Sequence, residues 1–310
     1  MKLRSLRDMD FENQRVLARM DFNVELNMTG EVQEHFKIEV LKKTIDFLAT
    51  FAGVKIAMLT HFGRPEGKHD PEYSTEKLAR TIEEVLGRSV VFVPDCVGKA
   101  VEDALENLSE GAVLLLENVR FYPGEEANDE AFARELAKPF TVYVNDAFGV
   151  DHRSHASLTT ITEFLPSYAG LRVLEEIEKL DEVLLLPEHP AVAIIGGAKI
   201  ETKLPLIRVL EEKYDCVIVG GKVANEAIDQ GITFSEKVLL PTDFDSANRL
   251  DIGPQTIAYY TQIIRTAKTI IWNGPMGKFE EKPYDIGTDA VLHAILEGEA
   301  FVVIGGGESL

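Results

Sequence analysis

The sequence predicts an α/β protein made of two doubly wound, parallel-sheet (Rossmann-like) domains that are joined by a hinge helix. Ten short apolar runs rich in Val, Ile and Leu recur along the 310 residues, and helical stretches separate most of them. Most of the runs are continuous, as is typical of strands that are covered on both faces. Alternation of strand and helix favours parallel sheets, and one long helical stretch divides the runs into two groups of five.

The first half of the chain contains five of the predicted strands. They are expected at residues 15–20, 54–60, 90–93, 112–118 and 141–146. Between the second and the third strand, residues 74–87 predict a helix that Ser74 caps and Gly87 ends. Residues 129–138 predict another helix before the fifth strand. The first domain is therefore placed at residues 1–170.

The second half repeats this organisation. Its strands are expected at residues 191–197, 216–221, 237–243, 269–274 and 300–307. The preceding stretch LRVLEEIEKLDEVLLL is apolar at roughly helical spacing, so residues 171–187 are interpreted as the connecting helix. The second domain then covers residues 188–310.

The composition excludes several classes of protein. The formal net charge of −20 is shared by both halves, which disfavours general binding to nucleic acid or to an anionic membrane. Cys96 and Cys216 lie in different halves without a CxxC spacing, so neither a disulfide framework nor a structural zinc site is supported. The N-terminus lacks the apolar core of a signal peptide, and no apolar run approaches the ~20 residues of a membrane span. We expect a cytoplasmic, monomeric protein without nucleic-acid or membrane partners.

Charged and polar side chains follow several strands of the first half, at the positions where ligands bind in open α/β sheets. They are Asp21, Asn23, His61, Arg64, Arg120, His152, Arg153 and His155. A single arginine at a strand end is most often solvated or salt-bridged. The sequence HRSH could also hold a metal through two histidines, but Arg153 between them and the lack of a third ligand disfavour this. Together the residues predict a basic cup for a small, multiply anionic molecule, with Asp21 and Asn23 orienting its hydroxyls.

Glycine-rich turns follow the strands of the second half. Three of its five strands end in Gly-Gly or Gly-Gly-Gly, and the first turn continues into Lys199 and Lys203, which share a helix face. Glycines admit a ligand close to the backbone, and a helix N-terminus with two cations suits a phosphate. The turns therefore predict a nucleotide site. The two commonest nucleotide fingerprints, GxxxxGK[ST] and GxGxxG, are nevertheless absent.

The chain closely resembles the phosphoglycerate kinase family. The resemblance is carried by RMDFNV, HFGRP, ENVRFYPGEE, VNDAFGVDHRSHAS, IIGGAK, DIGPQT, IWNGPMGKFE and VIGGGES, which occur in the family's order over nearly the whole chain. It implies two α/β domains that close around 1,3-bisphosphoglycerate and Mg-ADP and transfer the acyl phosphate to ADP, giving 3-phosphoglycerate and ATP. The nucleophile of this reaction is already anionic. The site must therefore position groups and offset charge, and it needs no general base.

The resemblance also assigns roles to individual residues. It implies that Arg19, Lys37, Lys199 and Lys203 are catalytic. For phosphoglycerate it implies a site of Asp21, Phe22, Asn23, Lys37, His61, Phe62, Gly63, Arg64, Arg120, His152, Arg153 and His155. For the nucleotide it implies Lys199, Lys203, Gly220, Gly221, Asn273, Gly277, Glu280, Gly306, Gly307, Glu308 and Ser309. Glu308 is expected to reach the Mg²⁺ that accompanies ADP or ATP.

The chain departs from the family's pattern at four places. Lys37 replaces an arginine, Thr202 replaces an aspartate between the two lysines, and Glu308 replaces another aspartate. The second domain is also short: a helical stretch before the LPTD run is missing, and the family's C-terminal tail is expected to be lacking. The alternative hypothesis is therefore a catalytically impaired or non-catalytic phosphoglycerate-binding relative. An α/β dehydrogenase is a further alternative, which the missing cofactor fingerprint disfavours. A purely structural protein is another, and it would leave the basic cup unexplained.

Overall fold

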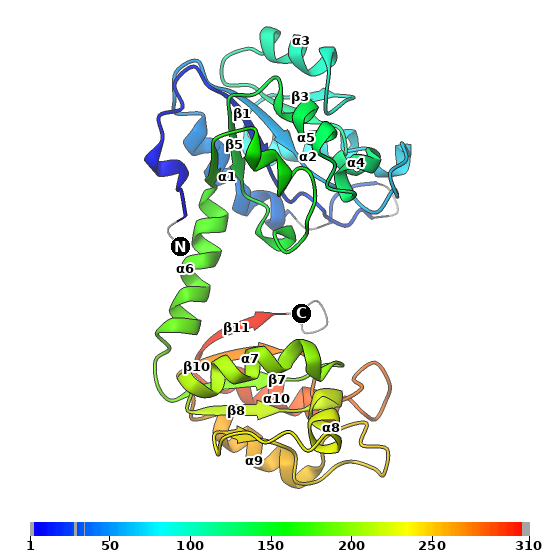
Figure 1. The fold of residues 1–310 in the computed structure, drawn as a ribbon, viewed down its shortest axis with the longest axis vertical. Coiled ribbons are helices and arrows are strands. Elements are labelled where there is room, and N and C mark those ends of the chain that lie inside the picture. Colours follow the sequence, from blue (N-terminus) through cyan, green and yellow to red (C-terminus); the bar gives the residue numbers. More distant parts are fainter. Residues whose placement is uncertain (1–2, 28–29, 34, 306–310) are drawn as a thin grey trace. The chain divides into compact units, whose positions relative to one another are not determined.

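The computed structural model describes residues 3–27, 30–33 and 35–305, and the chain divides into two compact units, Met1–Ile177 and Glu178–Leu310 (Figure 1). Each unit contains one parallel sheet with helices on both faces. The predicted fold class is confirmed, and each of the ten predicted runs contains a strand.

The sheet of the first unit has the strand order β3-β4-β2-β1-β5-β6, and all of its ladders are parallel. Its strands are β1 (Arg15–Arg19), β2 (Lys55–Leu59), β3 (Val90–Val93), β4 (Val113–Leu116), β5 (Val142–Asn145) and β6 (Ser167–Ala169). The prediction missed β6, because a three-residue Ser-Tyr-Ala strand has no apolar run. This strand forms at the edge of the sheet by pairing with β5.

Helices cover both faces of this sheet and enclose two cores. They are α1 (Phe36–Leu48), α2 (Glu76–Leu86), α3 (Lys99–Asn107), α4 (Pro123–Glu126) and α5 (Glu130–Ala137). Successive strand residues alternate between the faces: Val16 and Ala18 pack with α1 and α2, whereas Leu17 packs with α3 and α5. Because both faces are buried, the strands show continuous apolar sequence and no alternation.

The ends of α2 differ in part from the prediction. Gly87 ends the helix in the left-handed conformation with φ 69°, as predicted. The N-cap residue is Thr75 and not Ser74, so this prediction was wrong by one position. The Ser74 hydroxyl accepts a 3.2 Å hydrogen bond from the Glu76 amide and donates a 2.8 Å bond to the buried Glu117 carboxylate.

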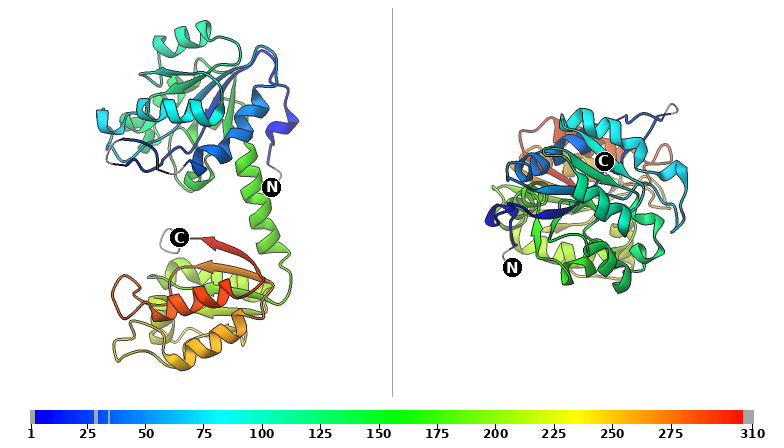
Figure 2. Two further views of the ribbon diagram at one scale, coloured as in Figure 1. Left: turned by 180° about the vertical axis from the view of Figure 1, so that it is seen from behind. Right: turned by 90° about the horizontal axis from the view of Figure 1, so that it is seen from above.

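The second sheet has the order β11-β10-β7-β8-β9, again with parallel ladders. Its strands are β7 (Ala191–Ile195), β8 (Cys216–Val219), β9 (Val238–Leu239), β10 (Thr269–Asn273) and β11 (Phe301–Gly305). Its helices are α7 (Ile200–Lys213), α8 (Gly221–Asp229), α9 (Pro254–Ile264) and α10 (Ile286–Leu296). One face packs against α7 and α8, and the other against α9 and α10, which lie together in Figure 2 (left, orange and red).

Helix α6 (Leu171–Leu185) lies at the predicted connection between the two groups of strands. Its second and third amides, those of Arg172 and Val173, donate to the buried carboxylate of Asp146, which follows β5. Val173 near its start is buried in the first unit, and Val183 near its end joins a core of the second. Nowhere in the described ranges is a helix both long and apolar enough to cross a membrane.

Each sheet has a position at which the chain reverses the direction in which it adds strands. In the first sheet it lies between β1 and β5, and in the second between β7 and β10. Loops diverge at such positions and leave a crevice beyond the carboxyl ends of the strands. Arg19 and Asn145 pair at the end of the first crevice, and Ile195 and Asn273 pair at the end of the second.

Candidate active site

Arg19 is the last residue of β1, and its guanidinium is buried with 1% of the residue exposed. Nε donates a 3.0 Å hydrogen bond to the Ser157 hydroxyl, and Nη2 lies 3.3 Å from His61 Nδ1. Nη1 donates to the backbone carbonyl of Met20. The fork of Arg19 is therefore held in one orientation at the crevice between β1 and β5.

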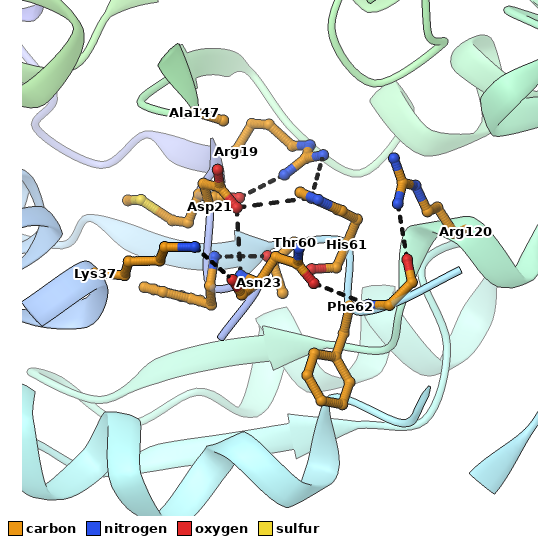
Figure 3. A network of polar contacts seen from close by, with 12 residues as sticks. Arg19, Asp21, Asn23, Lys37, Thr60, His61, Phe62, Arg120 and Ala147 are labelled. Atoms are coloured by element: carbon orange, nitrogen blue, oxygen red, sulfur yellow. Dashed lines mark hydrogen bonds and ion pairs between the residues drawn. The ribbon is translucent and has the colours of Figure 1, made fainter. Parts of the chain in front are cut away.

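His61 follows β2 and lies beside Arg19 (Figure 3). Burial, together with the positive charges of Arg19, Arg120 and Arg153, lowers the pKa of His61 from 6.5 to about 2. The ring is therefore neutral at physiological pH. Because arginine can only donate, Nδ1 accepts from Arg19 and the ring proton resides on Nε2.

Asn23 connects three segments around this centre (Figure 3). Its side-chain oxygen accepts a 2.9 Å hydrogen bond from the Gly63 amide, and its carbonyl accepts a 3.0 Å bond from Lys37 Nζ. Asp21 Oδ1 accepts a 3.3 Å bond from the Asn23 amide and lies 3.9 Å from His61 Nδ1. Lys37, near the start of α1, therefore points toward the loop that carries Asp21 and Asn23.

Arg120 and Arg153 add positive charge on the same side of the sheet. Arg120 donates a 2.7 Å bond to the Gly63 carbonyl, and its Nε lies 3.2 Å from Glu126. Arg153 lies in the loop after β5, and its Nε is buried without a hydrogen-bond partner among the described residues. The contribution of both arginines to the lowered pKa of His61 places them in one positive field.

Two of the predicted cup residues lie apart from this network. Arg64 and His152 are exposed, and the Arg64 side chain forms no hydrogen bond or ion pair with another described residue. Phe22 and Phe62 are buried and contribute through their backbone: the Phe22 amide donates to Thr60, and the Phe62 amide to Asn118. Within the described ranges, no three or more His, Cys, Asp or Glu side chains are grouped so that they could hold a metal.

Several glycines of the second unit are required by close packing between turns, which the sequence did not reveal. A Cβ on Gly196 would lie 2.0 Å from the Pro275 carbonyl, and one on Gly220 would lie 2.5 Å from Met276 Sδ. A Cβ on Gly277 would lie 2.4 Å from Asp251. The turns after β7, β8 and β10 thus pack directly on one another. A Cβ on Gly197, by contrast, would have no neighbour closer than 4.0 Å, and the φ of 96° is the reason for a glycine there.

A pocket of about 530 Å³ opens beside these turns, a size that suits a small ligand. Two predicted nucleotide residues, Gly277 and Glu280, line it. The remaining lining residues are Gly197, Ala198, Lys222, Asn225, Glu226, Asp229, Asn248, Arg249, Leu250, Pro275 and Lys278. The other predicted nucleotide residues that the structure describes lie on or next to these turns and do not line the pocket: Lys199, Lys203, Gly220, Gly221 and Asn273. Gly306, Gly307, Glu308 and Ser309 lie outside the described residues.

The two lysines of the first turn differ in environment. Lys199 is exposed at the N-cap of α7, whereas Lys203 donates a hydrogen bond to the side chain of Asn273, the last residue of β10. The first amide of α7, that of Ile200, is bonded at 2.9 Å to the Glu226 carboxylate. This donor is therefore already satisfied by an anion of the protein, and the lysines remain as the groups suited to a phosphate.

Several residues of the two sites escaped the sequence reasoning. Glu125 and Ser157 support Arg19 from sites far along the chain, and Glu226 satisfies the start of α7. None of these residues directly follows a strand, and a position directly after a strand is the sequence signal that predicts a ligand contact. ENVRFYPGEE contains Glu125, so only the motif itself could have pointed to it.

Comparisons with known proteins agree on one family. The family model described as phosphoglycerate kinase matches residues 6–249 and 241–310. The chain is 39% identical to the phosphoglycerate kinase of Pelotomaculum thermopropionicum, covering 100% of this chain and 90% of that protein. It is 40% identical to that of Moorella thermoacetica, covering 99% and 89%. The solved phosphoglycerate kinase of Coxiella burnetii superposes with a TM-score of 0.78 at 29% identity, over 99% of this chain and 89% of that one. The chain belongs to the phosphoglycerate kinase family.

Proposed function

We propose that this chain is an active phosphoglycerate kinase, which transfers the acyl phosphate of 1,3-bisphosphoglycerate to ADP and also runs the reverse reaction. The observation that carries the proposal is the buried network of Arg19, His61 and Arg120 at the crevice of the first sheet. A neutral histidine beside fixed guanidinium groups leaves these groups as the charged hydrogen-bond donors that a phosphoglycerate can bind.

The residues have distinct proposed roles. Arg19, Arg120 and Arg153 bind the carboxylate and phosphate of the substrate, and Asp21 and Asn23 orient its hydroxyl. Lys37 neutralises charge on the phosphoryl group in transfer, as do Lys199 and Lys203. The nucleoside binds the pocket lined by Gly277 and Glu280. Closure of the two domains, which the family resemblance implies, stays a prediction.

Magnesium is proposed to arrive with the nucleotide. Mg²⁺ is usually bound through substrate phosphates and one or two carboxylates, so a dedicated protein cage is not required. Glu308 is the carboxylate expected to reach it. When bound, the ion offsets charge on the phosphates, and the lysines of the β7–α7 turn do the same from the protein side.

A coupled assay tests the activity. The assay mixture contains 3-phosphoglycerate, Mg-ATP, NADH and an excess of a dehydrogenase that reduces the 1,3-bisphosphoglycerate formed. We expect NADH to be oxidised, and EDTA should abolish the oxidation. Lys203→Met should lose most of the rate, whereas Lys213→Met, at the far end of the same helix, should keep it. Binding of 3-phosphoglycerate without turnover would favour a non-catalytic relative.

The proposal also covers the cellular setting and the oligomeric state. We expect a cytoplasmic monomer that acts on small molecules alone, because the charge of −20 opposes nucleic acid and anionic membranes. Light scattering on the purified protein tests the monomer: a mass of twice 34.5 kDa would contradict it.

A further inference from the structure

Glu125 is a fully buried carboxylate that touches the candidate site only through other side chains. It belongs to α4, and both of its oxygens are used by one residue of a distant loop. Oε1 accepts a 2.7 Å hydrogen bond from the Ser157 hydroxyl, and Oε2 accepts a 2.8 Å bond from the Ser157 amide. Such a two-point attachment fixes the position and the orientation of Ser157.

Ser157 in turn passes this constraint to Arg19. A hydroxyl has one hydrogen, and an arginine can only donate. Since Arg19 Nε donates to Ser157 Oγ at 3.0 Å, the Ser157 hydrogen must go to Glu125. The direction of the hydrogen bonds is therefore determined along the whole path, from Arg19 to Ser157 to Glu125.

Glu125 also restrains the loop after β5, through both its side chain and its backbone carbonyl. His155 Nδ1 lies 3.6 Å from Glu125 Oε1, and the Ala156 amide donates a 2.9 Å bond to the Glu125 carbonyl. Burial alone would raise the pKa of Glu125, but hydrogen bonding with His155, the charge of Arg19 and the bonds from Ser157 outweigh it and lower the pKa below its usual range. Glu125 is therefore ionised at physiological pH and balances the buried charge of Arg19.

We propose that Glu125 and Ser157 are positioning residues that hold Arg19 and the His155 loop in the geometry that binds phosphoglycerate. The inference rests on the proposed function. Neither residue needs to touch the substrate. Without Ser157 the Arg19 guanidinium loses the bond that orients its Nε edge, and without the Glu125 charge the buried arginine lacks its counter-ion.

The chain offers a matched control for this arrangement. Ser74 and Glu117 form the same motif in the same unit: the Ser74 hydroxyl donates at 2.8 Å to Glu117, which also accepts a 2.9 Å bond from the Thr75 amide. Glu117 is 3% exposed, and in the described structure it has no hydrogen bond or ion pair with Arg19, His61, Arg120 or Arg153. Among the described residues, Glu117 reaches the cup only through Asn118, whose amide donates to it at 2.8 Å and whose side chain accepts from the Arg120 amide. Ser74→Ala therefore removes a comparable bond to a buried carboxylate that has no contact with Arg19.

The test is calorimetric titration of three proteins: the full wild-type chain, Ser157→Ala and Ser74→Ala. Each is titrated with 3-phosphoglycerate and, in a separate experiment, with ADP. Ser157→Ala should bind 3-phosphoglycerate about ten-fold more weakly, the usual effect of losing a hydrogen bond to a charged group. Its affinity for ADP should be unchanged, and Ser74→Ala should bind both ligands like the wild type. In the coupled assay, the KM for phosphoglycerate should rise while the KM for ATP stays constant.

A double-mutant cycle separates positioning from general loosening. If Ser157 acts through Arg19, adding Ser157→Ala to Arg19→Gln should change the 3-phosphoglycerate affinity less than roughly two-fold. Glu125→Gln is the second variant should Ser157→Ala fail to fold, because its shape is conserved while the charge is lost. Glu125→Gln should likewise weaken the binding of 3-phosphoglycerate and leave the binding of ADP unchanged.

Wild-type affinity for 3-phosphoglycerate in the folded variants would overturn the positioning role, and so would an equal loss in Ser157→Ala and Ser74→Ala. Additive effects of Ser157→Ala and Arg19→Gln would also contradict it. Failure of the proposed function has a different signature, because the wild-type chain itself would then bind no 3-phosphoglycerate.

Discussion

Lys37 stands where the family resemblance implies an arginine, and its side chain points toward the loop of Asp21 and Asn23. Its Nζ donates a 3.0 Å bond to the Asn23 carbonyl. A lysine retains the positive charge at this position but cannot form the two parallel bonds by which arginine binds a carboxylate or phosphate.

Lys37→Arg should therefore raise kcat/KM for phosphoglycerate, by roughly three- to ten-fold if one charge-assisted bond is gained. Steady-state assays on both substrates measure this. Lys43→Arg, an exposed position on the same helix, is the control and should leave the rate unchanged. Identical kinetics for the wild type and Lys37→Arg would remove Lys37 from the site.

A substitution of the exposed Arg64 tests whether this residue of the predicted basic cup binds substrate. Because its side chain is solvent-exposed, Arg64→Ala should change the free energy of unfolding by no more than about 0.5 kcal/mol. If Arg64 binds substrate, the same variant should bind 3-phosphoglycerate about ten-fold more weakly. Calorimetric titration and urea unfolding provide the two values. Arg80→Ala, an exposed arginine on α2, is the control, and equal affinity of the two variants would exclude Arg64.

The start of α6 depends on one buried carboxylate. Asp146 Oδ1 accepts bonds of 2.9 Å and 3.0 Å from the amides of Arg172 and Val173. Burial raises the pKa of Asp146 from 3.8 to about 6, although these hydrogen bonds oppose the shift. Since the folded-state pKa lies above the unfolded one, this group favours folding at low pH, and its contribution is lost as the pH rises from about 4 to about 6.

Asp146→Asn retains an acceptor for both amides and removes the buried charge. The free energy of unfolding of the variant relative to wild type should therefore increase between pH 4 and pH 6 and be constant above that range. Asp146→Ala leaves both amides unpaired and should be less stable than Asp146→Asn by roughly 1–3 kcal/mol at every pH. Unfolding curves at four or five pH values measure both. A flat difference for Asp146→Asn would show that the group titrates normally.

The packed turns of the second unit are tested by Gly196→Ala. The added Cβ would meet the Pro275 carbonyl at 2.0 Å, so the β7 and β10 turns must separate. We expect a loss of stability of roughly 1–3 kcal/mol and weaker ADP binding, with 3-phosphoglycerate binding retained. Gly298→Ala is the control, since its nearest neighbour would lie at 3.5 Å. Unchanged ADP affinity in a folded Gly196→Ala variant would separate these turns from nucleotide binding.

At the scale of the whole molecule, the two units are expected to respond to different ligands. Hydrogen–deuterium exchange should show that 3-phosphoglycerate protects most strongly the end of β1, which carries Arg19, and the segments after β2 and β5, which carry His61 and Arg153. ADP should protect most strongly the segments 196–203 and 274–280. A ligand stabilises the state that binds it, so at about 100 times its Kd the gain reaches ~2.7 kcal/mol. The reverse pattern would contradict the assignment of the two sites.

By itself the sequence determined the fold class, the strands and the family. Each predicted run contains a strand, because continuous apolar sequence and turn residues are local signals. The long motifs ENVRFYPGEE and IWNGPMG indicated the family directly, and the turns after the strands indicated where to look for ligands.

Only the tertiary structure decided how those segments support one another. It showed that β6 pairs at the sheet edge, that Gly196 and Gly220 are needed for contact between turns, and that Glu226 occupies the start of α7. It also joined Arg19 to Ser157, 138 positions along the chain, and Ser157 to Glu125, 32 positions away. Local patterns carry no information on such pairs, because buried hydrogen bonds and close backbone contacts arise only when distant segments pack together.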